Sequence, residues 1–381
     1  MVYTARLTVL GSLNMDISVT VPDLPVPGAT VLGRAAVFAP GGKGANQAVA
    51  AARLARDAGM PVAMIGCAGD DEFGRTMRAA LQAEGIDDSR VRTVTGVPTG
   101  IAMITVDQAG ENMITVAPGA NHEVSTADIA ARRNRPASRA DAQGAAPPGP
   151  EAASMSRDVL VISAEVPIPV IAAALAESAG RALRVLNLAP APPRAEAAGL
   201  IGAGPEWLVV NESEAAAVLG RSVAGLTEAA DAAADLVAAG ARNAVVTAGA
   251  AGAAYCGPQA PEGAHQPTDA RHATDAHQPT DPRHATGARP AAGPAPADVP
   301  RPGVIKIPGF KVTAVDTVGA GDTFVGALAV ALAASVPPVD AVTAAAAAGA
   351  AAAARPGTQP GMPRPADVLA VTGHSWPVTP R

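Results

Sequence analysis

The sequence predicts a doubly wound α/β fold, with a mostly parallel sheet flanked by helices and a small β-sheet lid. Short β-rich runs alternate with helical patterns along most of the chain, and polar residues follow the ends of those runs. An early region is instead rich in strand signals and poor in helical ones. Alternation of strand and helix favours parallel pairing, because each crossover between strands then carries a helix.

The elements of the main unit follow from apolar runs and from helical periodicity. The expected strands are Leu7–Leu10, Val62–Ile65, Val159–Ile162, Leu183–Leu186, Trp207–Val210, Arg242–Val246 and Val304–Ile307. The expected helices are Ala45–Ala58, Phe73–Glu84, Ile168–Ser178, Glu212–Leu219, Glu228–Ala239, Gly321–Ala334 and Val339–Ala354. Thr227 is placed to cap the helix that begins at Glu228.

The lid is predicted from three segments in which apolar positions alternate. They are Ile17–Val21, Thr30–Phe38 and Ile101–Thr115, the last of them split near Gly110. Alternation with a period of two is typical of a strand with one buried face. We expect these strands, within residues 17–38 and 101–115, to form an antiparallel sheet packed on the main unit as a flap.

Two segments differ in composition from the rest. Residues 257–303 contain ten prolines and only one Val, Ile or Leu, and they include the related units HQPTDARHAT (265–274) and HQPTDPRHAT (277–286). Residues 133–157 contain no aromatic residue and no Val, Ile or Leu. Such segments bury too little apolar surface to offset their ordering entropy. We expect two disordered insertions in a single domain that spans residues 1–381.

Composition also excludes several classes of function. The net charge of −6 lacks the basic footprint of a nucleic-acid-binding protein. Two cysteines, Cys67 and Cys256, are too few for a disulfide scaffold and fit a reducing compartment. The apolar run at Ala327–Val336 ends at Pro337 and is too short to span a bilayer. We expect a cytoplasmic protein without nucleic-acid or membrane partners.

The strongest motif is DTVGAGDTF at residues 316–324, ahead of an apolar helix. Gly319 and Gly321 let the backbone turn its N–H groups toward one point at the positive end of that helix, which suits a phosphate. Asp322 lies in the first turn, where a carboxylate can take a proton from an attacking hydroxyl. The alternative is that Asp322 only caps the helix.

A second motif, GGKGANQ at residues 41–47, lacks the spacing of a P-loop. Its glycines allow close approach of a ligand, and Lys43 and Asn46 offer donors that suit vicinal hydroxyls. The alternative is a Gly-rich loop that simply begins a buried helix.

A third motif, GSLNMD at residues 11–16, ends the first strand. Ligands of open α/β sheets bind outside the carboxyl ends of the strands, so Asn14 and Asp16 are candidates to hold sugar hydroxyls. Taken alone, Asp16 is better explained as a turn residue.

Polar groups also follow four later strands. They are Glu165, Asn187, the run Asn211–Glu214, and the stretch Thr247-Ala248-Gly249 with Gly252. Because the carboxyl ends of parallel strands share one edge of the sheet, we expect one crevice lined by these groups.

Six ordered motifs together resemble a known family. They are GSLNMD, GGKGANQAVA, GDDEFG (69–74), NLAPAP (187–192), NESEA (211–215) and DTVGAGDTF. In this order they resemble the ribokinases, a group within the phosphofructokinase-B-type carbohydrate kinases. The resemblance runs from about Leu7 to Gly361, outside the two odd segments.

The resemblance implies the reaction and its residues. ATP and D-ribose would give D-ribose 5-phosphate and ADP, with Asp322 as general base on the 5-hydroxyl. Gly319, Ala320 and Gly321 would form the anion hole for the γ-phosphate. The implied ribose-binding residues are Asn14, Asp16, Gly42, Lys43, Asn46, Glu165 and Asp322. The implied nucleotide-binding residues are Asn211, Thr247, Ala248, Gly249, Gly252 and Gly321.

The resemblance also implies metals and an oligomer. Glu214 would take part in handling Mg²⁺ and phosphate. A monovalent cation, usually potassium, would be held by Asp316, Val318, Ala352, Arg355, Gly357 and Gly361. The lid would close on the sugar and also form the interface of a homodimer. Two other functions remain as alternatives: a kinase for a related pentose or a nucleoside, and an inactive protein that senses a sugar or nucleotide.

Overall fold

The computed structural model describes residues 5–109, 111–130, 157–258 and 303–379. Most of the two predicted insertions lies outside the described residues. The bounds predicted for the second insertion, 257–303, are slightly too wide. Gly257 is the last residue of strand β12 and Gly303 is the first residue of strand β13.

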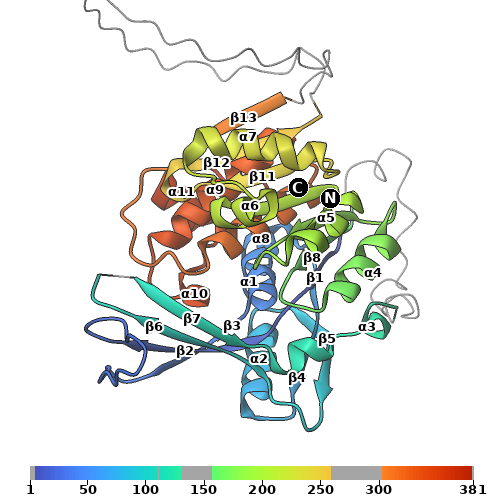
Figure 1. The fold of residues 1–381 in the computed structure, drawn as a ribbon. Coiled ribbons are helices and arrows are strands. Elements are labelled where there is room, and N and C mark those ends of the chain that lie inside the picture. The colour runs from blue at the N-terminus through green and yellow to red at the C-terminus, as the bar shows by residue number, and fades with distance from the viewer. Residues whose placement is uncertain (1–4, 110, 131–156, 259–302, 380–381) are drawn as a thin grey trace, which may run out of the picture.

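The main sheet has nine strands and confirms the predicted fold class (Figure 1). Its order is β13 (Gly303–Pro308), β12 (Gly252–Gly257), β11 (Ala244–Thr247), β10 (Trp207–Asn211), β9 (Leu183–Asn187), β8 (Val159–Ser163), β1 (Leu7–Leu10), β4 (Val62–Gly69) and β5 (Asp87–Val94). The seven strands from β11 to β5 pair in parallel, and β12 and β13 pair antiparallel at one edge.

Helices cover both faces of this sheet. One face packs against α1 (Lys43–Ala55), α2 (Glu72–Ala83), α8 (Ala320–Ala333), α9 (Pro338–Ala353) and α11 (Pro365–Thr372). The other packs against α3 (Thr126–Ala130), α4 (Ile168–Ser178), α5 (Arg194–Gly202), α6 (Glu212–Leu219) and α7 (Gly225–Ala238). In β8, Val159 and Val161 join the first core, while Leu160 and Ile162 join the second. Strands buried on both faces are continuous apolar runs in sequence, as β8 is.

The small sheet stands apart from the main one, below α10 (Thr358–Gly361) in Figure 1. Its order is β3 (Val37–Gly41), β2 (Asn14–Thr20), β6 (Gly100–Val106) and β7 (Asn112–Ala117). The split of the third lid segment near residue 110 is confirmed. The pairing is mixed rather than antiparallel throughout, because β2 runs parallel to β6.

The structure differs from the predicted elements at several places. The strand predicted for Thr30–Phe38 begins only at Val37, which pairs with Ser18 of β2. By the same register, residues 30–34 lie beyond Thr20, where β2 ends. Apolar Leu32 is consequently 89% exposed. Thr227 does not cap a helix, since α7 begins at Gly225 and the Thr227 hydroxyl accepts from Lys306 Nζ at 3.0 Å.

Six helices and strands had no counterpart in the prediction: β5, β12, α3, α5, α10 and α11. Strand β5 carries two aspartates and two arginines and buries only Val91, so it has no apolar alternation. Strand β12 is rich in glycine and alanine, and α5 follows a proline-rich stretch.

Candidate active site

The Asp322 carboxylate lies at the start of α8 and is only 9% exposed. Two amide side chains from the first turn of α1 hold it: Asn46 Nδ2 donates to Oδ2 at 3.0 Å, and Gln47 Nε2 donates to Oδ1 at 3.1 Å. A second layer fixes these amides. Gln359 Nε2 donates to Asn46 Oδ1 at 3.1 Å, and Gln47 Nε2 also donates to Asn187 Oδ1 at 2.9 Å.

No side chain caps α8, so the alternative that Asp322 serves as its cap is wrong. The helix begins after Gly319, whose φ of +80° is in the left-handed region that glycine adopts without strain. The Ala320 N–H donates to the Thr317 carbonyl at 3.2 Å. Among the described residues, no acceptor faces the N–H groups of Gly321 and Asp322. The Ala320 N–H, expected to take part in the anion hole, is therefore already paired, and the free amides are those of Gly321 and Asp322. Two free amides at the N-terminus of a 14-residue helix form a site for an anion.

Four carboxylates surround Lys43 at the start of α1. The Glu165 carboxylate accepts from the Lys43 backbone N–H at 3.2 Å and from the Ser12 hydroxyl. Burial alone lowers the pKa of Lys43, but the charges of Asp322, Glu165, Glu214 and Asp16 outweigh burial and raise it. The ammonium group therefore stays charged at neutral pH.

The Asp16 side chain lies on β2 against the backbone of Gly41. A Cβ at position 41 would lie 2.0 Å from Asp16 Oδ2, so any residue larger than glycine would displace the Asp16 carboxylate. Burial, with the charges of Glu165 and Asp322, raises the pKa of Asp16 to about 7. Burial likewise raises the pKa of Glu165, and the Lys43 charge offsets only part of that effect.

All but one of the predicted nucleotide-binding residues lie at or just after the carboxyl ends of β10 and β11, and the exception, Gly321, lies in the first turn of α8. Asn211 Oδ1 accepts from the Glu214 N–H and Glu214 Oε2 accepts from the Asn211 N–H, both at 2.8 Å, which makes a capping box for α6. Burial raises the pKa of Glu214. Thr247 ends β11.

After Thr247 the chain makes a tight turn through Ala248 and Gly249. The Ala248 N–H donates to the Gly252 carbonyl at 2.8 Å. Gly252 has a φ of +114°, and a Cβ there would lie 2.1 Å from the Ile307 carbonyl oxygen. The turn therefore requires glycine at position 252.

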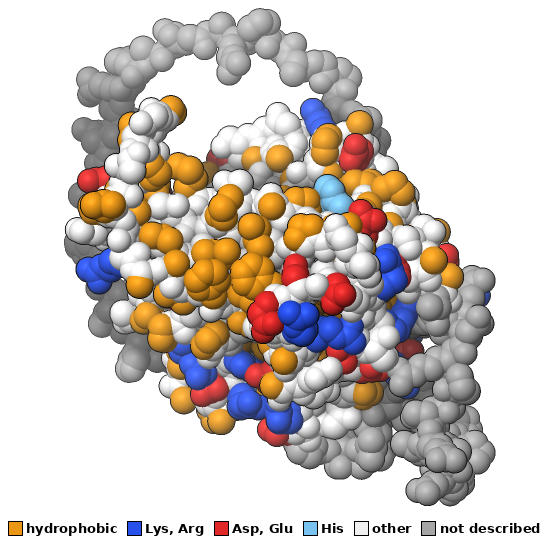
Figure 2. All heavy atoms as spheres, turned by 90° about the horizontal axis from the view of Figure 1, so that it is seen from below, with side chains coloured by type: hydrophobic (Ala, Val, Ile, Leu, Met, Phe, Trp, Pro, Cys, Tyr) orange, Lys and Arg blue, Asp and Glu red, His pale blue; other side chains and the backbone are white. Residues whose placement is uncertain are grey.

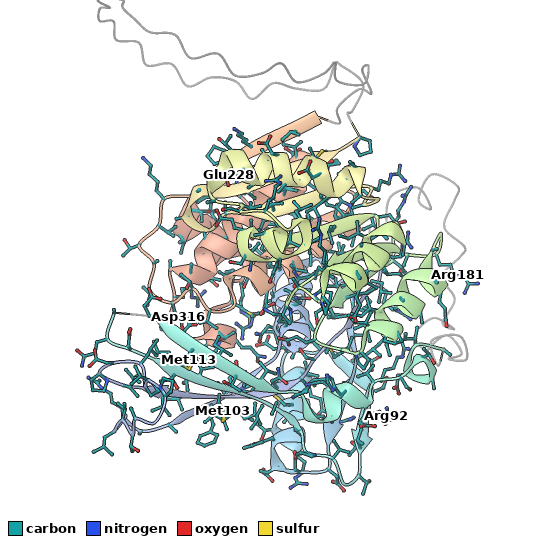
Figure 3. All side chains as sticks on the ribbon, in the orientation of Figure 1. Arg92, Met103, Met113, Arg181, Glu228 and Asp316 are labelled. Carbon is teal, nitrogen blue, oxygen red and sulfur yellow. The ribbon has the colours of Figure 1, made fainter. Side chains whose placement is uncertain are left out.

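The predicted cation residues lie in two segments that Asp316 joins: the loop ahead of α8, and the stretch from the end of α9 to the end of α10. Asp316 Oδ1 accepts from the Val318 N–H and Oδ2 from the Gly357 N–H, both at 3.0 Å. In Figure 3 Asp316 is labelled on the side of the main domain that faces the lid. Beyond it, a Cβ at Gly361 would lie 3.2 Å from the Arg355 carbonyl oxygen and 3.6 Å from that of Ala352. Backbone oxygens thus converge beside Gly361.

Four residues that hydrogen-bond to predicted site residues were not predicted themselves: Ser12, Gln47, Asn121 and Gln359. Gln47 had a usable signal, because positions 43, 46 and 47 share one face of a helix. Asn121 contacts Leu13 and Asn14 from a segment more than a hundred residues later. No local pattern reports such a contact.

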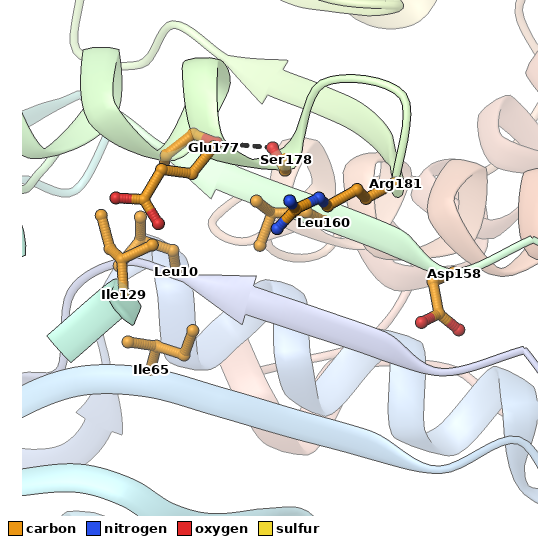
Figure 4. A pocket seen from close by; sticks show the side chains of 9 residues that line it. Leu10, Ile65, Ile129, Asp158, Leu160, Glu177, Ser178 and Arg181 are labelled. Carbon is orange, nitrogen blue, oxygen red and sulfur yellow. Dashed lines mark hydrogen bonds between the residues drawn. The ribbon is translucent and has the colours of Figure 1, made fainter. Parts of the chain in front are cut away.

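The cavity in Figure 4 is not part of this site. It measures about 260 Å³ and lies among α3, α4 and the strands β1, β4 and β8, with Leu10, Ile65 and Leu160 in its wall. These side chains belong to the core on the face of the sheet away from α1 and α8. None of the predicted site residues lines it.

Comparison with known proteins identifies the family of the chain. The model of the pfkB family of carbohydrate kinases matches residues 4–277 and 292–365. A ribokinase of Schizosaccharomyces pombe is 32% identical over 364 residues, which cover 94% of this chain and 95% of that protein. A ribokinase of Mus musculus is 29% identical over 330 residues, which cover 86% and 82%.

Solved structures show the same fold. The ribokinase of Thermotoga maritima has a TM-score of 0.69 and 27% identity, covering 96% of this chain and 98% of that one. The ribokinase of Arabidopsis thaliana, determined with ribose and ATP, has a TM-score of 0.69 and 24% identity over 97% of this chain and 99% of that one. The family match over most of the chain confirms the resemblance: the protein belongs to the pfkB family of carbohydrate kinases, among the ribokinases.

Proposed function

We propose that the protein transfers the γ-phosphoryl group of ATP to O5 of D-ribose, giving D-ribose 5-phosphate and ADP. One observation carries this proposal: a buried carboxylate, Asp322, lies beside two unpaired amides at the start of α8. The arrangement supplies a proton acceptor and an anion site within one helical turn. Its family relatives include ribokinases across bacteria, yeast and animals.

In the proposed reaction, Asp322 takes the proton of the 5-hydroxyl as O5 attacks the γ-phosphorus. The new O5–P bond forms while the bond from the γ-phosphorus to the β–γ bridging oxygen breaks, and ADP leaves with that oxygen. The amides of Gly321 and Asp322 hold the oxygens of the transferring group. Phosphoryl transfer depends mostly on such positioning and charge stabilisation.

Ribose is proposed to bind between the lid strand β2 and the start of α1. Asn14 and Asp16 present an amide and a carboxylate from β2, and Gly42, Lys43 and Asn46 present donors from the opposite side. Glu165 accepts from the Lys43 backbone and so fixes this loop. An acceptor carboxylate surrounded by amide and ammonium donors suits vicinal hydroxyls, since each hydroxyl both donates and accepts.

ATP is proposed to lie along Asn211 and the turn from Thr247 to Gly252, with Mg²⁺ bound to its phosphates. The described residues contain no cluster of three or more His, Cys, Asp or Glu that suits a metal ion. Mg²⁺ commonly binds through one or two carboxylates together with phosphates and water. The second oxygen of Glu214 fits that pattern, because only Oε2 is used in the capping box.

The two segments joined by Asp316 fit a monovalent cation. The carbonyl oxygens of Ala352, Arg355 and Pro356 all lie within 3.6 Å of the point where a Cβ at Gly361 would stand. Converging carbonyl oxygens replace the hydration shell of potassium in other proteins. The proposed ligands are Asp316, Val318, Ala352, Arg355, Gly357 and Gly361, and the ion would stiffen the loop ahead of α8.

We also propose a homodimer that forms through the lid. Residues opposite each other in a sheet share a face, and the register places Phe38 and Met103 on the face away from Asp16. These side chains are 58% and 49% exposed. Figure 3 labels Met103 and Met113 on the lid strands, and Figure 2 shows apolar side chains gathered on the surface seen from below.

Sedimentation velocity of a Met103→Glu variant tests the dimer, which is expected to become a monomer. Leu369→Glu is the matched control, because Leu369 is 50% exposed on α11, outside the lid. A Met103→Glu protein that sediments as a dimer, or a wild type that is monomeric, contradicts the proposal.

No helix in the described ranges is long and apolar enough to cross a membrane. We propose a cytoplasmic location.

The proposed substrate is tested by kcat/KM for ATP-dependent phosphorylation across D-ribose, 2-deoxy-D-ribose, a nucleoside and fructose 6-phosphate. D-ribose is expected to be preferred. The Asp322→Asn variant is expected to be inactive, and Asp340→Asn, which removes a first-turn carboxylate from α9, is the matched control. Preference for another pentose or a nucleoside overturns the ribose assignment. Absence of any turnover favours a sensing protein.

A further inference from the structure

The Asn121 side chain lies where the lid joins the main sheet. Asn121 belongs to a 3₁₀ turn, Gly119–Glu123, that follows the last lid strand, and it is 1% exposed. Its amide makes three hydrogen bonds to the segment that links β1 to β2. Oδ1 accepts from the Leu13 N–H at 2.8 Å, and Nδ2 donates to the Leu13 carbonyl at 3.1 Å and to Asn14 Oδ1 at 2.7 Å.

These bonds determine the orientation of both amides. A backbone N–H only donates and a carbonyl only accepts, so Leu13 fixes which atom of Asn121 is oxygen and which is nitrogen. The two hydrogens of Asn121 Nδ2 are then both used. The atom of Asn14 that faces Nδ2 must therefore be the acceptor, Oδ1.

The Asn14 NH₂ group is consequently turned away from Asn121. Gly100 closes the other side of the amide pair, since a Cβ there would lie 2.2 Å from Asn14 Oδ1 and 2.3 Å from Asn121 Nδ2. Asn14 thus presents its donor group on the strand that carries Asp16.

We infer that Asn121 is a positioning residue that makes Asn14 a hydrogen-bond donor, and never an acceptor, toward the sugar. This rests on the proposed function. Asn14 and Asp16 are two residues apart on β2 and so share a face. The Asn14 NH₂ group is then a fixed donor beside the Asp16 carboxylate, which accepts. Together they would bind two neighbouring sugar hydroxyls, one that accepts from Asn14 and one that donates to Asp16.

The Asn121→Asp variant tests this role with almost no change of volume. At a pH where the new carboxyl is ionised, aspartate still accepts from the Leu13 N–H but cannot donate. The Asn14 amide then rotates to donate to it and turns Oδ1 toward the sugar. We expect the KM for D-ribose to rise about tenfold, the effect of replacing one attractive polar contact by a repulsive one, while kcat at saturation stays within about threefold.

The matched control is the same change in an Asn14→Ala background. If Asn121 acts through Asn14, Asn121→Asp no longer alters the KM for D-ribose once the Asn14 amide is gone. A rise that persists in that background overturns the inference and assigns Asn121 a role in hinge structure alone. An unchanged KM in the single variant also overturns it.

Calorimetric titration of D-ribose without ATP separates this inference from the proposed function and needs no turnover. Weaker binding by Asn121→Asp than by wild type, with equal binding stoichiometry, supports the positioning role. Binding of equal strength refutes it while leaving the ribose assignment intact. A wild type that does not bind D-ribose refutes both the ribose assignment and the role of Asn121 in reading that sugar.

Discussion

Removing the Asp16 carboxylate is expected to change how the stability of the protein depends on pH. Burial, with the charges of Glu165 and Asp322, raises the pKa of Asp16 from 3.8 to about 7 in the folded state. Between these values the folded protein holds a proton that the unfolded chain has lost. The associated stability is complete below about pH 4 and is lost as pH rises through about 7.

The magnitude follows from the two pKa values. Each pH unit between them costs about 1.4 kcal/mol of unfolding free energy. Between pH 5 and pH 8 the wild type is therefore expected to lose about 3 kcal/mol through Asp16. An asparagine side chain carries no charge at any of these pH values, so the Asp16→Asn variant escapes this loss.

Urea-induced unfolding at pH 5, 6, 7 and 8 measures the effect. The unfolding free energy of Asp16→Asn minus that of wild type is expected to rise by about 3 kcal/mol across the series. Asp23→Asn, which removes an exposed carboxylate from the segment after β2, controls for the loss of one acidic side chain. A difference between Asp16→Asn and wild type that stays flat with pH refutes the reasoning that burial suppresses the Asp16 charge.

Three further variants test the packing around the site. Gly41→Ala places a Cβ 2.0 Å from Asp16 Oδ2 and is expected to raise the KM for D-ribose more than it lowers kcat; an unchanged KM in steady-state kinetics contradicts the close approach. Arg53 donates to Glu84 and to the carbonyls of Gln359 and Met362, so Arg53→Met is expected to lower the unfolding free energy by about 3 kcal/mol. Urea-induced unfolding measures this change, and a loss below about 1 kcal/mol would show that other contacts hold α10 in place. Gly361→Ser adds an oxygen where backbone carbonyls converge and is expected to lower the potassium concentration for half-maximal activity, whereas a raised concentration argues against a cation at this place.

The main sheet could be predicted from the sequence because its strands are buried on both faces. Val159–Ser163 and Trp207–Asn211 are therefore continuous apolar runs bounded by polar loops. Strand β5 lies at an edge, where its charged side chains reach solvent, and no apolar run marks it. Thr30–Phe38 shows the opposite error, since apolar side chains there lie exposed where no partner strand continues.

The site could be predicted where its residues belong to one short motif. GGKGANQ places Lys43, Asn46 and Gln47 on one turn of α1, and GAGD places Asp322 next to the free amides of α8. The contacts between motifs could not be predicted. Gln359 reaches Asn46 across 313 positions and Asn121 reaches Asn14 across 107, and such pairs depend on the packing of the whole chain.

The position of the new phosphate on the sugar is the most direct test of the proposed reaction. Phosphorus and carbon NMR of the product from ATP and D-ribose are expected to show one phosphate on C5, formed in equal amount with ADP. Asp322→Asn is expected to form none of it at the same enzyme concentration, while Asp340→Asn forms it at the wild-type rate. Phosphate on another carbon, ADP released without sugar phosphate, or full activity of Asp322→Asn would contradict the account.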